Sequence, residues 1–200
     1  MTIPRSQPTL AALTAAEWES QDKVLKSFSL PLTSIVVRAT DSFPDQEIRQ
    51  GVIDNLLKYV HTDTVCYLQS YPDSLVKLQD TYWTPLIDWL RDAHKIEMRQ
   101  TEGILHVRQT DDTIQKLRSV IEKYSDIKLA AFEKAVMRSK SFIIGFALIE
   151  RAVSVEFATH ASLVEVNHQI QRWGEVEDSH DTDREDLKRQ LGAATCALLQ

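Results

Sequence analysis

Apolar residues recur at spacings of three and four from about residue 45 to the C terminus, and this period constrains the fold more than any other feature. The clearest case follows Pro44, where one helical face would carry six aliphatic side chains: Ile48, Val52, Ile53, Leu56, Leu57 and Val60. The same period predicts further helices within 75–96, 114–124, 127–137, 142–153, 155–173 and 187–198, with Pro85 starting or kinking one of them. Serines between them are expected helix caps: Ser125, Ser139, Ser141 and Ser154.

These patterns predict an all-α, mainly α fold, a single multi-helix domain over residues 1–200 with at most a short two-stranded β clip. No internal repeat and no Pro/Gly/Ser-rich linker divides the chain. The first 44 residues are less regular, and we expect an N-terminal helix followed by an extended segment over 30–37. Residues 64–68 and 103–107 have strand-like composition and are predicted to pair as the clip.

Composition excludes several classes of protein. Five glycines in 200 residues leave little material for glycine-lined phosphate loops. A net charge of −6 gives no excess of positive charge, so neither nucleic acid nor an anionic membrane is an expected partner. The longest apolar run, Phe142–Ile149, has eight residues and predicts a buried helix rather than a membrane span. Cys66 and Cys196 form no C-x-x-C pair, which fits a reducing compartment.

Negative charge is concentrated near the C terminus. Between Glu175 and Asp186, seven of the twelve residues are acidic and only Arg184 is basic, so this segment carries the whole surplus of the chain. Continued as one helix from Trp173, the segment would place an aromatic ring, acids and a histidine on one stripe. It is either a solvated helix end, favoured by the helix dipole, or a recognition surface for a basic partner. The candidate partner-binding residues are Trp173, Glu175, Glu177, Asp178, His180 and Asp181.

Metal binding is the alternative suggested by spacing. Glu165–His168 and Glu177–His180 are both E-x-x-H, a motif that di-iron bundles take from separate helices, so a metal-dependent helical-bundle oxidoreductase stays a candidate. The two motifs start only twelve residues apart, on one helix or two abutting ones, and surface ion pairs would explain both histidines. We therefore expect no metal and no cofactor. Cys66 lies near His61 without a third catalytic group and is expected to be a small buried residue.

Five landmarks together carry a resemblance to a known family. They are A-E-W-E-S-Q at 16–21, L-P-L-T at 30–33, T-D-T at 62–64, T-E-G-I at 101–104 and W-G-E-V-E-D-S-H-D at 173–181. In this order they resemble the mitochondrial ATP synthase assembly chaperones that bind the α subunit of the catalytic head. The family signature W-G-x-x-E-x-x-H-D is matched at Trp173, Gly174, Glu177, His180 and Asp181.

The resemblance implies a non-enzymatic, ATP-independent, monomeric chaperone of the mitochondrial matrix. It would hold the unassembled α subunit, shield the surface that later meets the β subunit, and leave when that partner arrives. Relatives carry a smaller β-rich domain before the E-W-x-x-Q helix, and we expect that domain to be absent from this chain. Asp178 makes the local charge denser than the family pattern requires. A plain interaction module for another complex would share the same surface.

Overall fold

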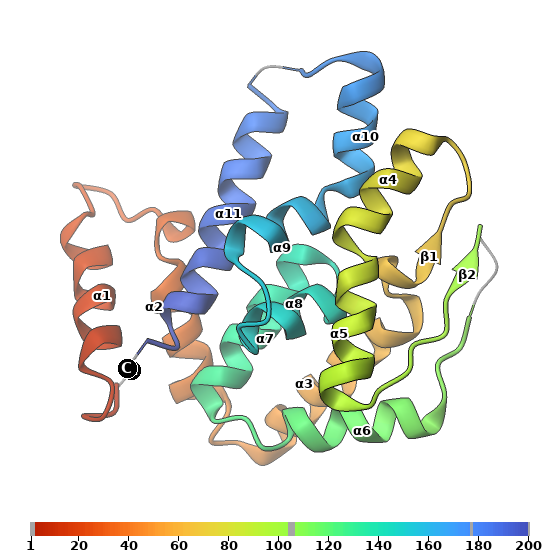
Figure 1. Cartoon of the computed structure of the whole chain (residues 1–200). Coiled ribbons are helices and arrows are strands. Elements are labelled where there is room, and N and C mark those ends of the chain that lie inside the picture. The colour runs from red at the N-terminus through yellow and green to blue at the C-terminus, as the bar shows by residue number, and fades with distance from the viewer. Residues whose placement is uncertain (1–2, 104–106, 177, 200) are drawn as a thin grey trace.

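A computed structural model describes residues 3–103, 107–176 and 178–199, and these form a mainly helical molecule (Figure 1). The α-helices are α1 (Pro8–Glu19), α2 (Pro31–Val37), α3 (Gln46–Tyr59), α4 (Asp73–Tyr82), α5 (Thr84–His94), α6 (Asp111–Ile121), α7 (Asp126–Ser139), α8 (Phe142–Ile149), α9 (Val155–Ser162), α10 (Val164–Trp173) and α11 (His180–Cys196). Short 3-10 turns occupy Ser27–Ser29, Val60–Thr62 and Thr64–Cys66, and a π-helical turn occupies Arg38–Ser42. The mainly α class expected from the apolar period is confirmed.

The core is organised around α8. All eight of its residues are buried, as the apolar run predicted, and α7, α9, α5, α3 and α11 pack around it. The phenyl rings of Phe132, Phe142 and Phe146 meet there at centroid distances of 5.0–6.2 Å. Among the described residues, no helix combines the length and the apolar content needed to cross a membrane.

Three of the four expected serine caps are confirmed. The hydroxyl groups of Ser125, Ser141 and Ser154 accept backbone N–H groups in the first turns of α7, α8 and α9. Ser139 instead ends α7, where its hydroxyl donates to the carbonyl of Ala135 at 2.8 Å.

A buried carboxylate fixes the start of α8. Asp63 is 1% exposed and accepts hydrogen bonds from the Ser141 hydroxyl at 2.7 Å, the Ile143 N–H at 3.0 Å and the Val65 N–H at 3.2 Å. Burial raises the pKa of this carboxyl to about 6, although the donated hydrogen bonds oppose the shift. Asp63 therefore ties the chain that follows α3 to the central helix.

The predicted extended segment over residues 30–37 is wrong, because Pro31–Val37 form α2 and Leu30 is its N-cap. Pro31 stands in the first turn, where its missing N–H has no cost. The Glu17 carboxylate on α1 accepts the Leu32 and Thr33 N–H groups at 2.7 and 2.8 Å and the Thr33 hydroxyl at 2.9 Å. A cap supplied from another helix is a tertiary contact, and local composition does not report it.

The predicted clip exists with a shifted second strand. β1 (Tyr67–Leu68) pairs in parallel with β2 (Thr101–Glu102), and Gly103, at φ +79°, donates its N–H to the Leu68 carbonyl at 2.9 Å. The first strand lies within the predicted segment, whereas the second precedes the predicted 103–107. Residues 104–106 lie outside the described residues.

Gly145 is where α8 crosses α7 most closely. A Cβ at this position would lie 2.8 Å from Cγ2 of Val136 and 3.0 Å from its backbone nitrogen. We expect Gly145→Ala to lower the free energy of unfolding by about 1–3 kcal/mol, because backbone cannot yield as a flexible side chain can. Gly51→Ala on α3 is the matched control, since nothing lies within 4 Å of its Cβ and alanine favours a helix by about 0.5–1 kcal/mol. Urea unfolding measures both, and equal effects would contradict the close approach.

Asp63 gives a pH-dependent prediction. Its folded-state pKa lies above the unfolded value, so the folded state binds more protons between about pH 4 and pH 6 and its contribution to stability falls as pH rises through that window. The stability of the wild type relative to Asp63→Asn should therefore increase as pH is lowered from about 7 to about 4.5. Urea unfolding at several pH values tests this, and a constant difference would contradict it. Carboxylates common to both proteins cancel in the comparison.

Candidate functional site

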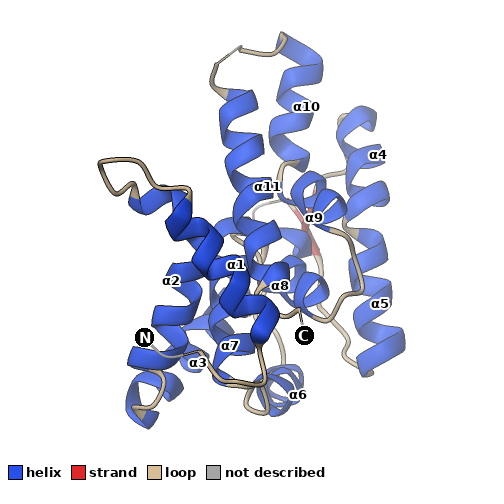
Figure 2. Cartoon of the chain, turned by 90° about the vertical axis from the view of Figure 1, so that its left-hand side faces the viewer, coloured by secondary structure: helices blue, strands red, loops and turns tan. Residues whose placement is uncertain are grey.

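Helices α10 and α11 form a hairpin that projects from the body (Figures 1 and 2). α10 packs against α4 and α9, whereas α11 packs against α7, α9 and α2. Gly174 ends α10 because its φ of +88° is a conformation that other residues rarely adopt. The acidic segment of the sequence thus forms the hairpin loop and the first turns of α11.

The expectation of one continuous stripe from Trp173 is wrong. Trp173 is the last residue of α10 and His180 is the first of α11, so the indole and the imidazole belong to different helices. Gly174 and a short loop separate the two helices. The prediction from spacing had assumed one uninterrupted helix. Glu177 lies outside the described residues.

The Trp173 side chain is the main exposed aromatic group of the hairpin. It is 71% exposed, and the Arg172 guanidinium lies over its ring, 5.2 Å from the centroid. Val176, in the loop, is 60% exposed and was not among the sequence candidates. Its position as an apolar residue within a run of acidic ones could have identified it from the sequence. The tip of the hairpin therefore offers two apolar side chains to a partner.

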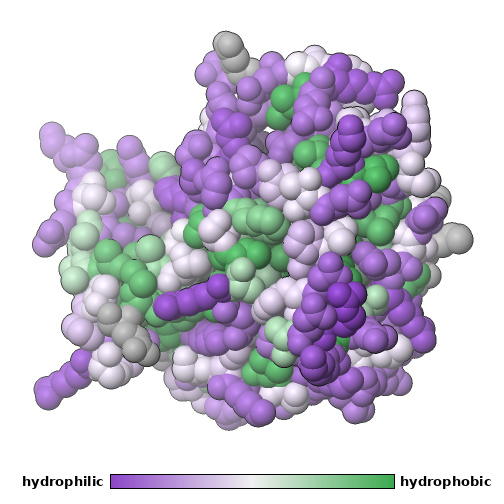
Figure 3. All heavy atoms as spheres, viewed as in Figure 1, coloured by the Kyte–Doolittle hydropathy of each residue, from purple (hydrophilic) through white to green (hydrophobic). Residues whose placement is uncertain are grey.

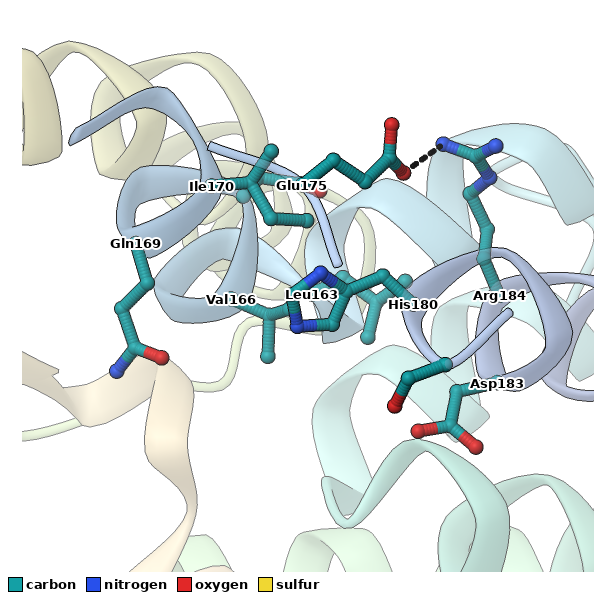
Figure 4. A pocket seen from close by; sticks show the side chains of 10 residues that line it. Leu163, Val166, Gln169, Ile170, Glu175, His180, Asp183 and Arg184 are labelled. Carbon is teal, nitrogen blue, oxygen red and sulfur yellow. Dashed lines mark ion pairs between the residues drawn. The ribbon is translucent and has the colours of Figure 1, made fainter. Parts of the chain in front are cut away.

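The polar groups of the tip partly satisfy one another (Figure 4). Arg184 pairs with Asp181 at 2.8 Å and with Glu175 at 3.8 Å. The His180 Nδ1 accepts the Val176 N–H at 3.1 Å, which closes the loop onto α11. These are exposed or half-exposed pairs of small energetic value, so the carboxylates remain available to a cationic partner.

Asp178 sits in the loop at φ +65°, a left-handed conformation that aspartate tolerates better than most residues. Its carbonyl accepts the Thr182 hydroxyl at 3.0 Å. Its backbone thus helps to turn the chain into α11, and its side chain is exposed.

The described residues of the two E-x-x-H motifs lie on different helices. Glu165 and His168 lie on α10, where the His168 Nδ1 is 3.2 Å from the Ser74 hydroxyl. His180 uses its Nδ1 to hold the loop. Across the described ranges, no group of three potential metal ligands of the His, Cys, Asp and Glu types comes together.

Cys66 is buried, as expected, and burial is the main reason that the pKa of its thiol is raised. A raised pKa keeps the sulfur protonated and unreactive, so this residue is not a candidate nucleophile.

A cavity of about 260 Å³ lies between α10 and α11, and the sequence did not indicate it. Figure 4 shows Val166 and Ile170 of α10 and His180 of α11 turned toward one another across this space. Leu163 continues the apolar side, and Asp183 stands on the opposite wall. The signal in the sequence was the spacing of Val166 and Ile170, which places two apolar side chains on one face of α10.

Comparison with known proteins identifies the family. The model of the ATP12 chaperone protein family matches residues 1–91. Protein atp12, mitochondrial, of Schizosaccharomyces pombe is 30% identical over 200 residues, covering 96% of this chain and 69% of the relative. The chain belongs to the ATP12 chaperone family. Protein ATP12, mitochondrial, of Saccharomyces cerevisiae is 28% identical, covering 98% of this chain and 72% of the relative. The resemblance drawn from the five landmarks is thereby confirmed.

Two solved structures share the fold of this ATP12-family chain. Atp12 from Paracoccus denitrificans superposes with a TM-score of 0.82 at 27% identity, covering 94% of this chain and 80% of the other. A putative chaperone from Agrobacterium tumefaciens gives a TM-score of 0.83 at 27% identity, covering 95% and 70% respectively. The arrangement of the helices is therefore similar to that of the Atp12 crystal structure and of the putative chaperone.

Two of the landmarks now have a structural role. In A-E-W-E-S-Q, Glu17 caps α2, which begins within L-P-L-T. Gln21 accepts the Lys26 N–H at 3.1 Å, and its amide donates to the Ser29 hydroxyl at 2.9 Å. These two motifs therefore hold the N-terminal helices α1 and α2 together.

Because Trp173 is exposed, its replacement should leave the stability of the fold nearly unchanged, so that an effect on binding could be attributed to the lost indole. Trp173→Ala should change the free energy of unfolding by no more than about 0.5 kcal/mol, as for other exposed side chains. Trp83→Ala is the contrast, with an expected loss of about 3–5 kcal/mol, because this indole is 2% exposed and its N–H donates to the Ala161 carbonyl at 2.9 Å. Urea unfolding compares the two variants, and a large loss for Trp173→Ala would show that the indole is packed in solution.

Proposed function

We propose that this ATP12-family chaperone assists assembly of the ATP synthase by holding the unassembled α subunit of the catalytic head. In this proposal it shields the surface of that subunit that later meets the β subunit, and it acts without enzymatic chemistry. The mitochondrial names of the yeast relatives support the mitochondrial matrix as its compartment.

The observation that carries this proposal is the composition of the hairpin tip. Trp173 and Val176 are exposed there beside the carboxylates of Glu175, Asp178 and Asp181. Exposed aromatic residues are frequent anchors of protein interfaces, and carboxylates around them steer basic partners. Glu177 and His180 belong to the same segment of the chain, and we include both among the partner-binding residues.

Such a tip suits a partner that is held and then released. A standard interface of about 1,600 Å² spans μM to pM affinity, depending on its anchors. A small apolar anchor with exposed charges belongs to the weaker part of that range, because surface ion pairs contribute little. The arriving β subunit then needs to displace only a modest interface.

Glu177→Lys is the deciding variant. We expect it to weaken capture of purified ATP synthase α subunit by about tenfold or more, a change of about 1.4 kcal/mol or more, because a repulsive charge replaces a steering one. The measurement is binding of the α subunit together with suppression of its aggregation. Thermal unfolding should change little.

The matched control is Glu19→Lys at the end of α1, an exposed charge reversal that the helix dipole favours. It should bind the α subunit as the wild type does. Failure of the wild type to bind the α subunit would refute the proposal. Equal weakening by both substitutions would show a general effect of net charge rather than a site at the tip.

A further inference from the structure

A groove runs along the inner side of the α10–α11 hairpin. The cavity of about 260 Å³ near the loop adjoins one of about 480 Å³ that extends toward the end of α7. Both are lined by Leu163, Val166 and Asp183, so they lie side by side, and the two together are here named the hairpin groove. Figure 3 shows apolar surface between hydrophilic rims in the upper part of the molecule, where the hairpin stands.

The apolar floor of the hairpin groove has no partner within the hairpin. α10 buries only Val164, whereas Val166 and Ile170 remain half-exposed. The buried residues of α11 begin at Leu187, so its first two turns rise beyond the contacts that hold it to the body. At the lower end of the groove, Met137 is 53% exposed. A helix with an uncovered apolar stripe is stabilised when another element covers it.

The charges on the two walls favour a cationic occupant. Glu165 on α10 and Asp183 on α11 are both exposed, and neither forms an ion pair with the described part of the chain. Two basic side chains of the lining are already engaged, Arg138 with Asp186 and Arg184 with Asp181 and Glu175. The third, Lys140, lies at the far end, beyond α7. Unpaired carboxylates on opposite walls therefore dominate the middle of the groove.

We propose that the hairpin groove receives an amphipathic helix of the client protein, with its apolar side on Val166 and Ile170 and a Lys or Arg directed to Glu165 or Asp183. The inference rests on the proposed function and adds to it the kind of segment that the chaperone binds. Both walls are helices whose main-chain groups are bonded internally, so they offer no edge to an extended peptide. A helical segment satisfies its own main chain and needs only side-chain contacts.

The first test uses synthetic peptides and the full chain. The probes are an amphipathic helix of Leu and Lys and its counterpart of Leu and Glu. The wild type should bind the Lys peptide more tightly, and Ile170→Asn should weaken that binding by about tenfold or more. Gln171→Asn is the matched control, because Gln171 is the exposed neighbour on α10 and lines neither cavity. Asp183→Lys should abolish the preference for the Lys peptide.

Thermal unfolding of each variant separates loss of binding from loss of fold. The inference is overturned when the two peptides bind equally to the wild type. Equal binding of the Lys peptide by Ile170→Asn and Gln171→Asn also overturns it.

The second test uses purified ATP synthase α subunit and separates the two proposals. A wild type that binds the Lys peptide through the groove but fails to bind the α subunit refutes the proposed function and leaves the groove as a helix-binding site. If the α subunit binds Ile170→Asn and Asp183→Lys as tightly as the wild type, the groove is not its binding site. The proposed function would then remain supported. A loss of α-subunit binding confined to the groove variants, with Gln171→Asn unaffected, supports both.

Discussion

The central helix α8 has no polar face, and the rest of the structure depends on covering it. Its eight residues are buried on every side, with α7 crossing it at Gly145 and α5 contributing Trp89 against Phe146 at 5.4 Å. An apolar helix of this kind is stable only when amphipathic helices surround it and bury their apolar faces against it. This explains why most helices of the chain show one clear apolar face. α10, at the periphery, instead leaves the apolar stripe of Val166 and Ile170 half-exposed.

One buried and one half-buried carboxylate connect helices that are separate in the sequence. Asp63 joins the end of the α3 region to the first turn of α8, and Glu17 joins α1 to the first turn of α2. In both cases the negative group meets unpaired N–H groups at the positive end of a helix, where such a group is most stabilising. Hydrogen bonds of this type fix orientation as well as contact. The helices consequently have defined relative positions, and the hairpin is held on a rigid base.

The two helices of the hairpin pack against the body rather than along each other. Both helices contact α9, but α10 otherwise packs on α4 and α11 on α7 and α2, so a groove opens between them and an acidic, aromatic tip closes its upper end. Stability here comes from the roots of the two helices, in α4 and in α7, rather than from contact along the hairpin. Because the packing is at the roots of the helices, the outer part of the hairpin can expose apolar and charged side chains without lowering the stability of the core. This arrangement is compatible with the proposed holding and release of a client.

The sequence by itself determined the mainly helical class, the buried nature of the 142–149 run and the family, because periodicity and short motifs are local properties that survive in one dimension. It also located the acidic segment, and the structure places the exposed Trp173 beside it at the hairpin tip. Only the tertiary structure decided that residues 31–37 are helical, since their cap comes from Glu17, and that Trp173 and His180 lie on separate helices, since Gly174 turns the chain between them. The groove likewise appears only in three dimensions, because its two walls come from helices that face each other without packing together.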